Sequence, residues 1–189
     1  RQMCIRDSIN STNVDAHDYE PTTSDIAKLQ KAQVIIVNGA GYDAWAVKAA
    51  QTANAIIVNA AEIGGVNDGE NPHVWFSADV RKAVAQAITE AYEQADAAKK
   101  NDFDKMNDRW TAEENNVESK IAEVKQKTDG LAYAATESVA SYLAEDMGLA
   151  DATPSGYARA TANESEPTPT DIKQFTDALK AGEIKPVSY

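Results

Sequence analysis

Cysteine and histidine are the scarcest chemically versatile residues in this sequence. The 189 residues contain one cysteine, Cys4, and two histidines, His17 and His73. A single cysteine excludes a disulfide framework within the chain, and two histidines with one remote cysteine cannot form a zinc finger. We therefore expect Cys4 to be chemically inert.

Long apolar runs and excess positive charge are also missing. No apolar run approaches the roughly 20 residues that cross a bilayer. We expect no export signal in residues 1–8, because this stretch lacks an apolar core. The net charge of −12 would repel the phosphates of nucleic acid, so we expect no nucleic-acid partner. The same charge favours cations near the surface, although acidity alone is usually a solubility device.

Familiar enzyme signatures are lacking as well. The turn Asn38-Gly39-Ala40-Gly41 does not contain the third glycine of a dinucleotide fingerprint, and no P-loop lysine is present. There is no Gly-x-Ser-x-Gly elbow. With 30 carboxylates some pairs must lie close together, so an acid–base pair chosen from them would be arbitrary. These enzyme chemistries therefore have no support in the sequence.

The pattern that is present near the N-terminus is strand, helix, strand. Residues 34–37 and 55–59 are continuous, largely β-branched apolar runs, which predict strands buried on both faces of a parallel sheet. Residues 44–52 predict a helix between them. A short strand is expected at 9–14, and Thr22-Thr23-Ser24-Asp25 predicts the start of another helix. Ligands bind beyond the carboxyl ends of parallel strands, so Asn38 and Asn59 are expected near any site.

The rest of the chain predicts mainly helices. Ser77-Ala78-Asp79 begins an amphipathic helix, and residues 101–127 predict a long, mostly polar helix that connects two lobes. Residues 131–135 are a weak strand candidate, and 139–147 predict a helix. We expect residues 151–164 to form mostly loop, with room for a short strand. A last helix begins near Pro167 and ends near Gly182, and a strand is expected to start at 187.

Two helix starts share a sequence. Residues 20–26 and 166–172 are identical at five of seven positions, including Glu-Pro-Thr and Asp-Ile. The distance between them is too long for a solenoid repeat. Two explanations remain open, namely chance similarity between two helix caps and two lobes of like topology.

His17 and His73 are candidate metal ligands. Both are expected in loops flanked by polar or turn-forming residues, and neutral imidazole binds zinc, manganese and iron. The alternative is that each is a structural histidine that only forms hydrogen bonds.

Three ordered motifs give the sequence a family resemblance. They are residues 15–25 (Asp-Ala-His-Asp-Tyr-Glu-Pro-Thr-x-Ser-Asp), residues 37–45 (Val-Asn-Gly-Ala-Gly-Tyr-Asp-x-Trp) and residues 71–75 (Asn-Pro-His-Val-Trp). Over residues 13–189 the chain resembles the metal-binding proteins of zinc and manganese ABC importers, known as solute-binding protein family 9 or cluster A-I.

The resemblance implies an α/β fold of two lobes with parallel sheets, joined by a single long connector helix, with the metal in the cleft between the lobes. The expected boundaries are an N-terminal lobe at 1–98, a connector at 101–127 and an incomplete C-terminal lobe at 129–189. Residues 1–8 are expected to be a ragged or foreign start.

The resemblance also implies the ligands. They are His17 and His73 in the first lobe and Glu137 in the second, with a fourth, carboxylate ligand expected beyond Tyr189. Many members carry histidine where this chain has Glu137. Two imidazoles with two carboxylates favour manganese or ferrous iron, although zinc still binds such sites tightly. The absence of histidine from residues 62–70 favours manganese too. The alternative role for Glu137 is a helix N-cap carboxylate.

The implied function is capture of a divalent transition metal, Mn²⁺ or Zn²⁺ with Fe²⁺ as a further candidate, and its delivery to an ABC permease. By this resemblance the protein is an extracytoplasmic, monomeric binding protein and not an enzyme. It would meet the membrane only through an N-terminal anchor outside this sequence. The alternatives are a metal-dependent hydrolase with the same ligands and an open coordination position, and a surface adhesin of the same family.

Overall fold

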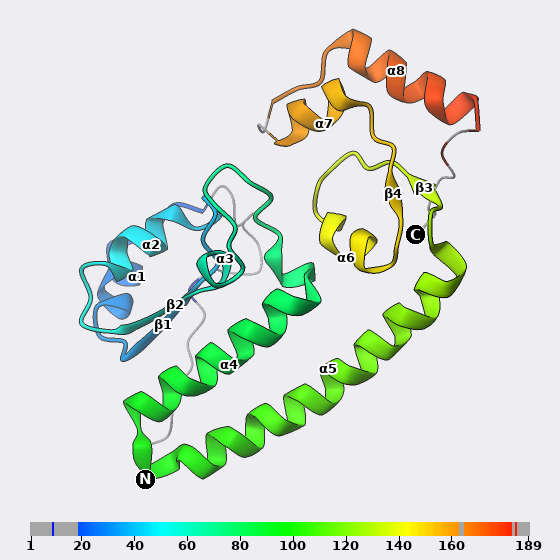
Figure 1. The fold of residues 1–189 in the computed structure, drawn as a ribbon. Coiled ribbons are helices and arrows are strands. Elements are labelled where there is room, and N and C mark those ends of the chain that lie inside the picture. The colour runs from blue at the N-terminus through cyan, green and yellow to red at the C-terminus, as the bar shows by residue number, and fades with distance from the viewer. Residues whose placement is uncertain (1–8, 10–18, 163–164, 183, 185–189) are drawn as a thin grey trace.

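The computed structural model describes residue 9, residues 19–162, residues 165–182 and residue 184. These residues form two α/β lobes joined by one long helix (Figure 1). The expected fold class is confirmed in these terms. Cys4 and the strand expected from 187 lie outside the described residues. Of the strand expected at 9–14, only residue 9 is described.

The first lobe begins with a helix and a parallel strand pair. Its elements are α1 (Thr23–Leu29), β1 (Val34–Val37), α2 (Ala44–Ala50) and β2 (Ile56–Asn59). β1 pairs with β2 in parallel, from Val34 opposite Ile56 to Val37 opposite Asn59. The predicted strand–helix–strand unit is therefore confirmed. Its core consists of buried side chains from α1, β1 and α2, namely Leu29, Ile35, Val37, Ala46, Ala49 and Ala50.

The expectation that both strands are buried on both faces is wrong in part. Ile36 is 46% exposed and Ile57 is 42% exposed. α2 contacts β1, and α4 contacts both strands, but these helices leave the two isoleucines uncovered. A continuous apolar run indicates a largely buried strand, yet it does not show how far the covering helices extend.

The first lobe continues through short helices into α4. One turn of helix, α3 (Ala60–Ile63), follows β2 directly and was not expected from the sequence. The 3-10 turn η1 (Val74–Phe76) leads into α4 (Ala78–Ala95), whose N-cap is Ser77, as predicted. A second small core lies under these elements and contains Ala40, Ala61, Val74 and Val80.

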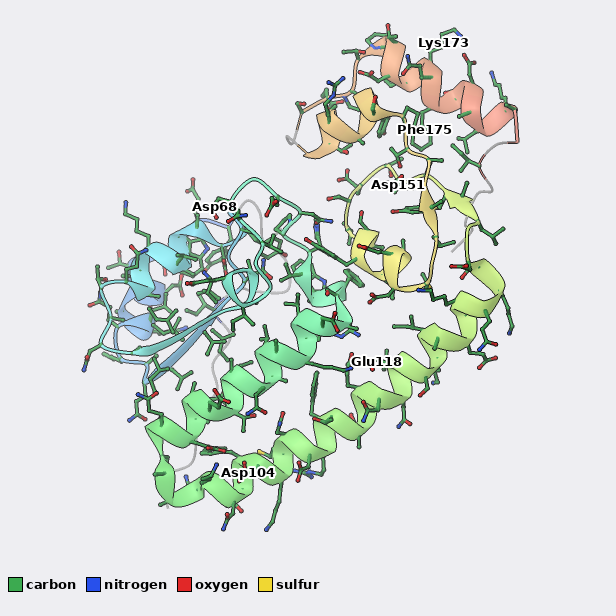
Figure 2. All side chains as sticks on the ribbon, viewed as in Figure 1. Asp68, Asp104, Glu118, Asp151, Lys173 and Phe175 are labelled. Atoms are coloured by element: carbon green, nitrogen blue, oxygen red, sulfur yellow. The ribbon has the colours of Figure 1, made fainter. Side chains whose placement is uncertain are left out.

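The long helix α5 (Lys100–Thr128) joins the lobes. It follows the 3-10 turn η2 (Ala97–Lys99) and lies antiparallel beside α4 before it continues to the second lobe (Figure 1). Tyr92 and Phe103 pack together at the turn, with ring centroids 5.4 Å apart. Glu118 lies on the side of α5 that faces α4, where it pairs with Lys82 (Figure 2). The predicted long polar helix is confirmed.

The second lobe has the same kind of parallel pairing on a smaller scale. β3 (Ala132–Tyr133) pairs with β4 (Ala150–Asp151), and α6 (Ser141–Asp146) connects them. Two further helices follow, α7 (Ser155–Ala162) and α8 (Pro169–Lys180). Phe175 of α8 stacks on Tyr157 of α7, with ring centroids 4.8 Å apart, whereas Lys173 lies on the outer side of α8 (Figure 2).

Helix α7 contradicts the expectation that residues 151–164 are mostly loop. The segment has no strong apolar periodicity, so its pattern does not predict a helix. Its residues nevertheless include three alanines and one arginine within Ser155–Ala162, and these residues have high helix propensity. Packing of Tyr157 against α8 supplies the remaining stabilisation.

The repeated sequence forms the same structure at both places. Thr22 and Asp25 form a capping box at the start of α1, and Thr168 and Asp171 form one at the start of α8. In each box the threonine hydroxyl accepts from the aspartate backbone N–H, and the aspartate carboxylate accepts from the threonine N–H. The repeated sequence therefore forms the same capping box in both lobes.

Among the described residues, the helices are either too short or too polar to cross a membrane.

Candidate metal centre

His73 lies in an ordered loop just before η1, as the sequence predicted. The residue is buried, with 8% of its surface exposed. Its backbone N–H donates to Oδ1 of Asn71 over 3.1 Å. The amide of Asn38 donates from Nδ2 to the carbonyl of Pro72 over 2.9 Å. Asn38 directly follows β1. The carboxyl end of this strand therefore lies next to the His73 loop, as expected.

The turn after β1 positions Asn38. The carboxylate of Asp43 accepts from the backbone N–H of Asn38 over 2.7 Å and from that of Gly39 over 2.8 Å. Gly39 has a φ of +79°, and a Cβ on it would lie 2.2 Å from Oδ1 of Asn59. Only glycine fits there. The turn therefore packs closely against Asn59 at the end of β2, and it holds Asn38 where its side chain reaches the His73 loop.

Two aromatic rings lie beside the imidazole of His73. Trp75 lies edge-on, with ring centroids 5.2 Å apart, and Tyr42 lies edge-on at 6.4 Å. Tyr42 and Trp75 also contact each other, at 5.2 Å. The burial of His73 beside these rings lowers the local dielectric, which strengthens any charge interaction made there.

Asn71 links His73 to the second lobe. Its Oδ1 lies 2.6 Å from Nδ1 of His73, and its Nδ2 donates to the carbonyl of Ser138 over 2.9 Å. The hydroxyl of Tyr142 donates to the carbonyl of Asn71 over 2.9 Å. The burial that comes with this contact raises the pKa of the Tyr142 hydroxyl, and the charges of Glu70 and Glu145 add to the effect.

Glu137 lies in the bend between β3 and α6 and is exposed. Its neighbour Ser138 accepts the hydrogen bond from Asn71, so the loop that carries Glu137 lies against the loop that carries His73. The alternative role as a helix N-cap is wrong. α6 begins at Ser141 and its N-cap is Ala140, because the helix starts later than the apolar pattern suggested.

His17 lies outside the described residues, so the complete set of proposed ligands cannot be assembled from them. Within residues 19–162 and the shorter described stretches, no three His, Cys, Asp or Glu side chains gather closely enough to hold a metal. What the structure does bring together is His73 and the loop of Glu137, one from each lobe. An imidazole and a carboxylate are donors that suit divalent transition metals.

Three residues at this site were missed at the level of sequence, namely Asn71, Ser138 and Tyr142. Asn71 offered a local signal, since an asparagine side chain two residues before a histidine can accept its backbone N–H. Ser138 and Tyr142 gave no such signal, because their contacts with Asn71 join residues 67 and 71 positions apart.

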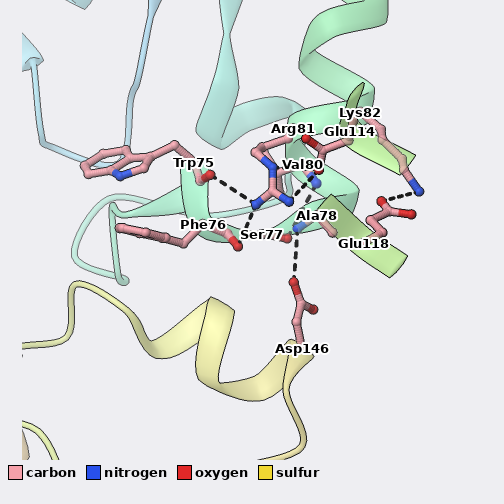
Figure 3. A network of polar contacts seen from close by, with 10 residues as sticks. All are labelled: Trp75, Phe76, Ser77, Ala78, Val80, Arg81, Lys82, Glu114, Glu118 and Asp146. Carbon is pink, nitrogen blue, oxygen red and sulfur yellow. Dashed lines mark hydrogen bonds and ion pairs between the residues drawn. The ribbon is translucent and has the colours of Figure 1, made fainter. Parts of the chain in front are cut away.

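A polar network fixes the turn that follows His73 (Figure 3). Arg81 of α4 donates from Nη1 to the carbonyls of Phe76, over 2.9 Å, and Trp75, over 3.3 Å. Its Nε donates to buried Glu114 of α5 over 2.8 Å. The backbone N–H of Ala78 donates to Asp146 of α6 over 3.3 Å. This network therefore connects η1, the long helix and the second lobe.

Comparison with known proteins identifies relatives over nearly the whole chain. The family described as "zinc-uptake complex component A periplasmic" matches residues 5–189. The high-affinity zinc uptake system protein ZnuA of Bacillus subtilis is 21% identical over 97% of this chain and 63% of its own length. The iron ABC transporter substrate-binding lipoprotein MtsA of Streptococcus pyogenes is 27% identical over 95% of this chain and 62% of its own length. The chain thus spans about three-fifths of the curated relatives it matches.

A solved structure shares the fold. The metal-dependent lipoprotein YcdH from Bacillus subtilis superimposes with a TM-score of 0.75 and 23% identity, over 93% of this chain and 67% of its own. At this level of identity the likeness supports the two-lobed fold alone.

Proposed function

Because the chain belongs to the family of periplasmic zinc-uptake component A proteins, we propose that it captures a divalent transition metal outside the cytoplasm and delivers it to an ABC importer. The metal is the cargo of this process and is released chemically unchanged. The protein therefore acts as a binding protein. We propose that it is a monomer and that its partner is the importer's permease.

The observation that carries this proposal is the hydrogen-bonded contact between the two lobes at His73. Asn71 contacts the imidazole of His73 and the carbonyl of Ser138, the residue next to Glu137. A ligand bound by His73 and Glu137 would thus be held by both lobes at once. We propose that His17, His73 and Glu137 are ligands of the transported ion.

Glu137 sets the proposed preference among metals. A carboxylate in place of a third imidazole makes the donor set harder, which favours Mn²⁺ and Fe²⁺ relative to a site rich in histidine. Zn²⁺ still binds such a site strongly, because it stands higher in the Irving–Williams order. Relatives named for zinc and for iron uptake support a choice within this group of metals.

The proposal is tested by titrating purified, metal-free protein with Mn²⁺ and Zn²⁺ in a calorimeter. We expect one ion per chain. His73→Ala and Glu137→Ala should each weaken binding by about tenfold or more, because each removes a ligand contributed by one lobe. Far-UV circular dichroism of each variant checks that the fold is retained.

Glu166→Ala is the matched control, since Glu166 is also an exposed glutamate in the second lobe. It should bind metal as the wild type does. Stoichiometric binding that survives both His73→Ala and Glu137→Ala unchanged would contradict the proposed ligands, and absence of any tight binding by the wild type would contradict the function.

A further inference from the structure

Asn71 has contacts on both sides of the interface between the lobes. We propose that Asn71 is a positioning residue for the metal site, whose single amide group both fixes the tautomer of His73 and fastens the His73 loop to the loop that carries Glu137. The inference rests on the proposed function only in treating His73 as a ligand. Its structural part concerns the metal-free protein and can be tested separately.

The orientation of the Asn71 amide follows from its second-lobe partner. The carbonyl of Ser138, 2.9 Å away, can only accept a hydrogen bond, so the NH₂ group of Asn71 must face it. The oxygen Oδ1 must then face His73, where it also accepts from the His73 backbone N–H over 3.1 Å. The amide therefore cannot be turned round without losing both contacts.

The tautomer of His73 follows from the orientation of that amide. Oδ1 has no proton to donate, so the atom 2.6 Å from it, Nδ1 of His73, must carry one. The neutral imidazole then has its lone pair on Nε2, so Nε2 is the ring nitrogen that would coordinate a metal. A hydrogen bond to the non-ligating ring nitrogen is the usual means by which proteins orient a ligand histidine.

The same residue ties the two lobes together. Ser138 accepts from the Asn71 side chain, and its hydroxyl lies 3.5 Å from Oδ1 of Asn71. Tyr142 donates to the Asn71 carbonyl. Ser138 directly follows Glu137, and Tyr142 lies in the first turn of α6. The amide that orients the His73 ring therefore also sets where the Glu137 loop lies relative to that ring.

Two substitutions separate these roles. Asn71→Ala removes both the acceptor for Nδ1 and the donor to Ser138. Asn71→Asp retains an acceptor for Nδ1 but places a carboxylate against the Ser138 carbonyl, where no donor remains. We expect Asn71→Ala to lose the fixed tautomer and to weaken metal binding by about 10- to 100-fold. Asn71→Asp should retain the tautomer while losing the tie to the second lobe.

The primary measurement is the tautomer of His73 in the metal-free protein, observed by long-range ¹H–¹⁵N NMR of labelled imidazoles. With only two histidines in the chain, His17→Gln assigns the signals. The wild type and Asn71→Asp should show Nδ1 protonated and Nε2 unprotonated, and Asn71→Ala should show a mixture. Asn116→Ala is the control, since Asn116 is an exposed asparagine of α5 and should leave the tautomer of His73 unchanged.

Mn²⁺ and Zn²⁺ titrations of the same variants complete the test. A wild type with Nε2 protonated would overturn the inference even if no variant folded. So would Asn71→Ala with both the tautomer and the metal affinity of the wild type. If the wild type binds no metal but shows the expected tautomer, the proposed function fails while the positioning of His73 by Asn71 stands.

Discussion

At the scale of single residues, the carboxylate of Asp25 accepts three hydrogen bonds at the start of α1. It accepts from the backbone N–H of Thr22 over 2.9 Å, from the Thr22 hydroxyl over 2.6 Å and from the Tyr19 hydroxyl over 2.8 Å. These bonds, led by that from the Thr22 hydroxyl, lower the pKa of the Asp25 carboxyl. Asp25 thus fixes the chain from residue 19 onward to the helix.

The lowered pKa makes a prediction about stability and pH. A carboxyl whose pKa is lower in the folded than in the unfolded protein contributes stability at pH values above the unfolded pKa, about 3.9 for Asp. That contribution is lost as the pH falls through the lower, folded pKa. Asp25→Asn should therefore be less stable than the wild type at pH 7, and the difference should shrink below about pH 4.

Urea unfolding followed by circular dichroism at several pH values measures this difference. Asp171→Asn is the counterpart in α8, since it removes the carboxylate of the matching capping box, to which no tyrosine of the described residues donates a hydrogen bond. We expect its effect at pH 7 to be the smaller of the two. A stability difference between wild type and Asp25→Asn that stays constant from pH 7 to pH 3 would refute this role for Asp25.

At the scale of helices and strands, the ion pair between Arg81 and Glu114 holds three elements together. Glu114 is the buried residue of α5, with 7% of its surface exposed. Both Nε and Nη2 of Arg81 donate to its carboxylate, while Nη1 donates to the end of η1. The pair therefore fixes the turn after His73 onto the connecting helix.

Breaking this pair should be costly. Glu114→Ala removes the counter-charge of the mostly buried Arg81 guanidinium. The loss of one partner from such a pair typically lowers the free energy of unfolding by about 3 kcal/mol. The measurement is the free energy of unfolding in urea. Glu123→Ala, at an exposed position of the same helix, should change it by less than about 0.5 kcal/mol. Equal effects of the two substitutions would show that the buried pair has no special part in stability.

Most elements could be predicted because their local signals agree with their surroundings. The box at Thr22 and Asp25 marks α1, and the β-branched runs mark β1 and β2. The long polar segment marks α5. Helix α7 could not be predicted from periodicity, because it is short and depends on the contact between Tyr157 and Phe175. The exposure of Ile36 could not be predicted either, since it depends on how far neighbouring helices extend.

The site shows the same division between local and distant information. His73 could be singled out from its rarity and its Asn-Pro-His context, and Glu137 from the resemblance to a family. The assignment of both as ligands, together with His17, stays a prediction. The bond from Asn71 to Ser138 could not be foreseen, because no pattern along the chain specifies which side chains of two lobes meet.

At the scale of the whole molecule, the arrangement of two lobes about α5 determines what the site can do. Besides this helix, the lobes are joined by the contacts of Asn71 with Ser138 and Tyr142 and by the bond from Ala78 to Asp146. These bonds bring the loops of His73 and Glu137 together. We propose that a divalent metal binds between the lobes at these two residues.

Anomalous diffraction at the zinc absorption edge, from crystals of the purified protein grown with Zn²⁺, tests this claim most directly. We predict a strong peak about 2.0–2.1 Å from a ring nitrogen of His73 and about 2.0–2.2 Å from a carboxylate oxygen of Glu137. A peak bound by His73 without Glu137, or one held only by surface carboxylates far from both, would contradict it.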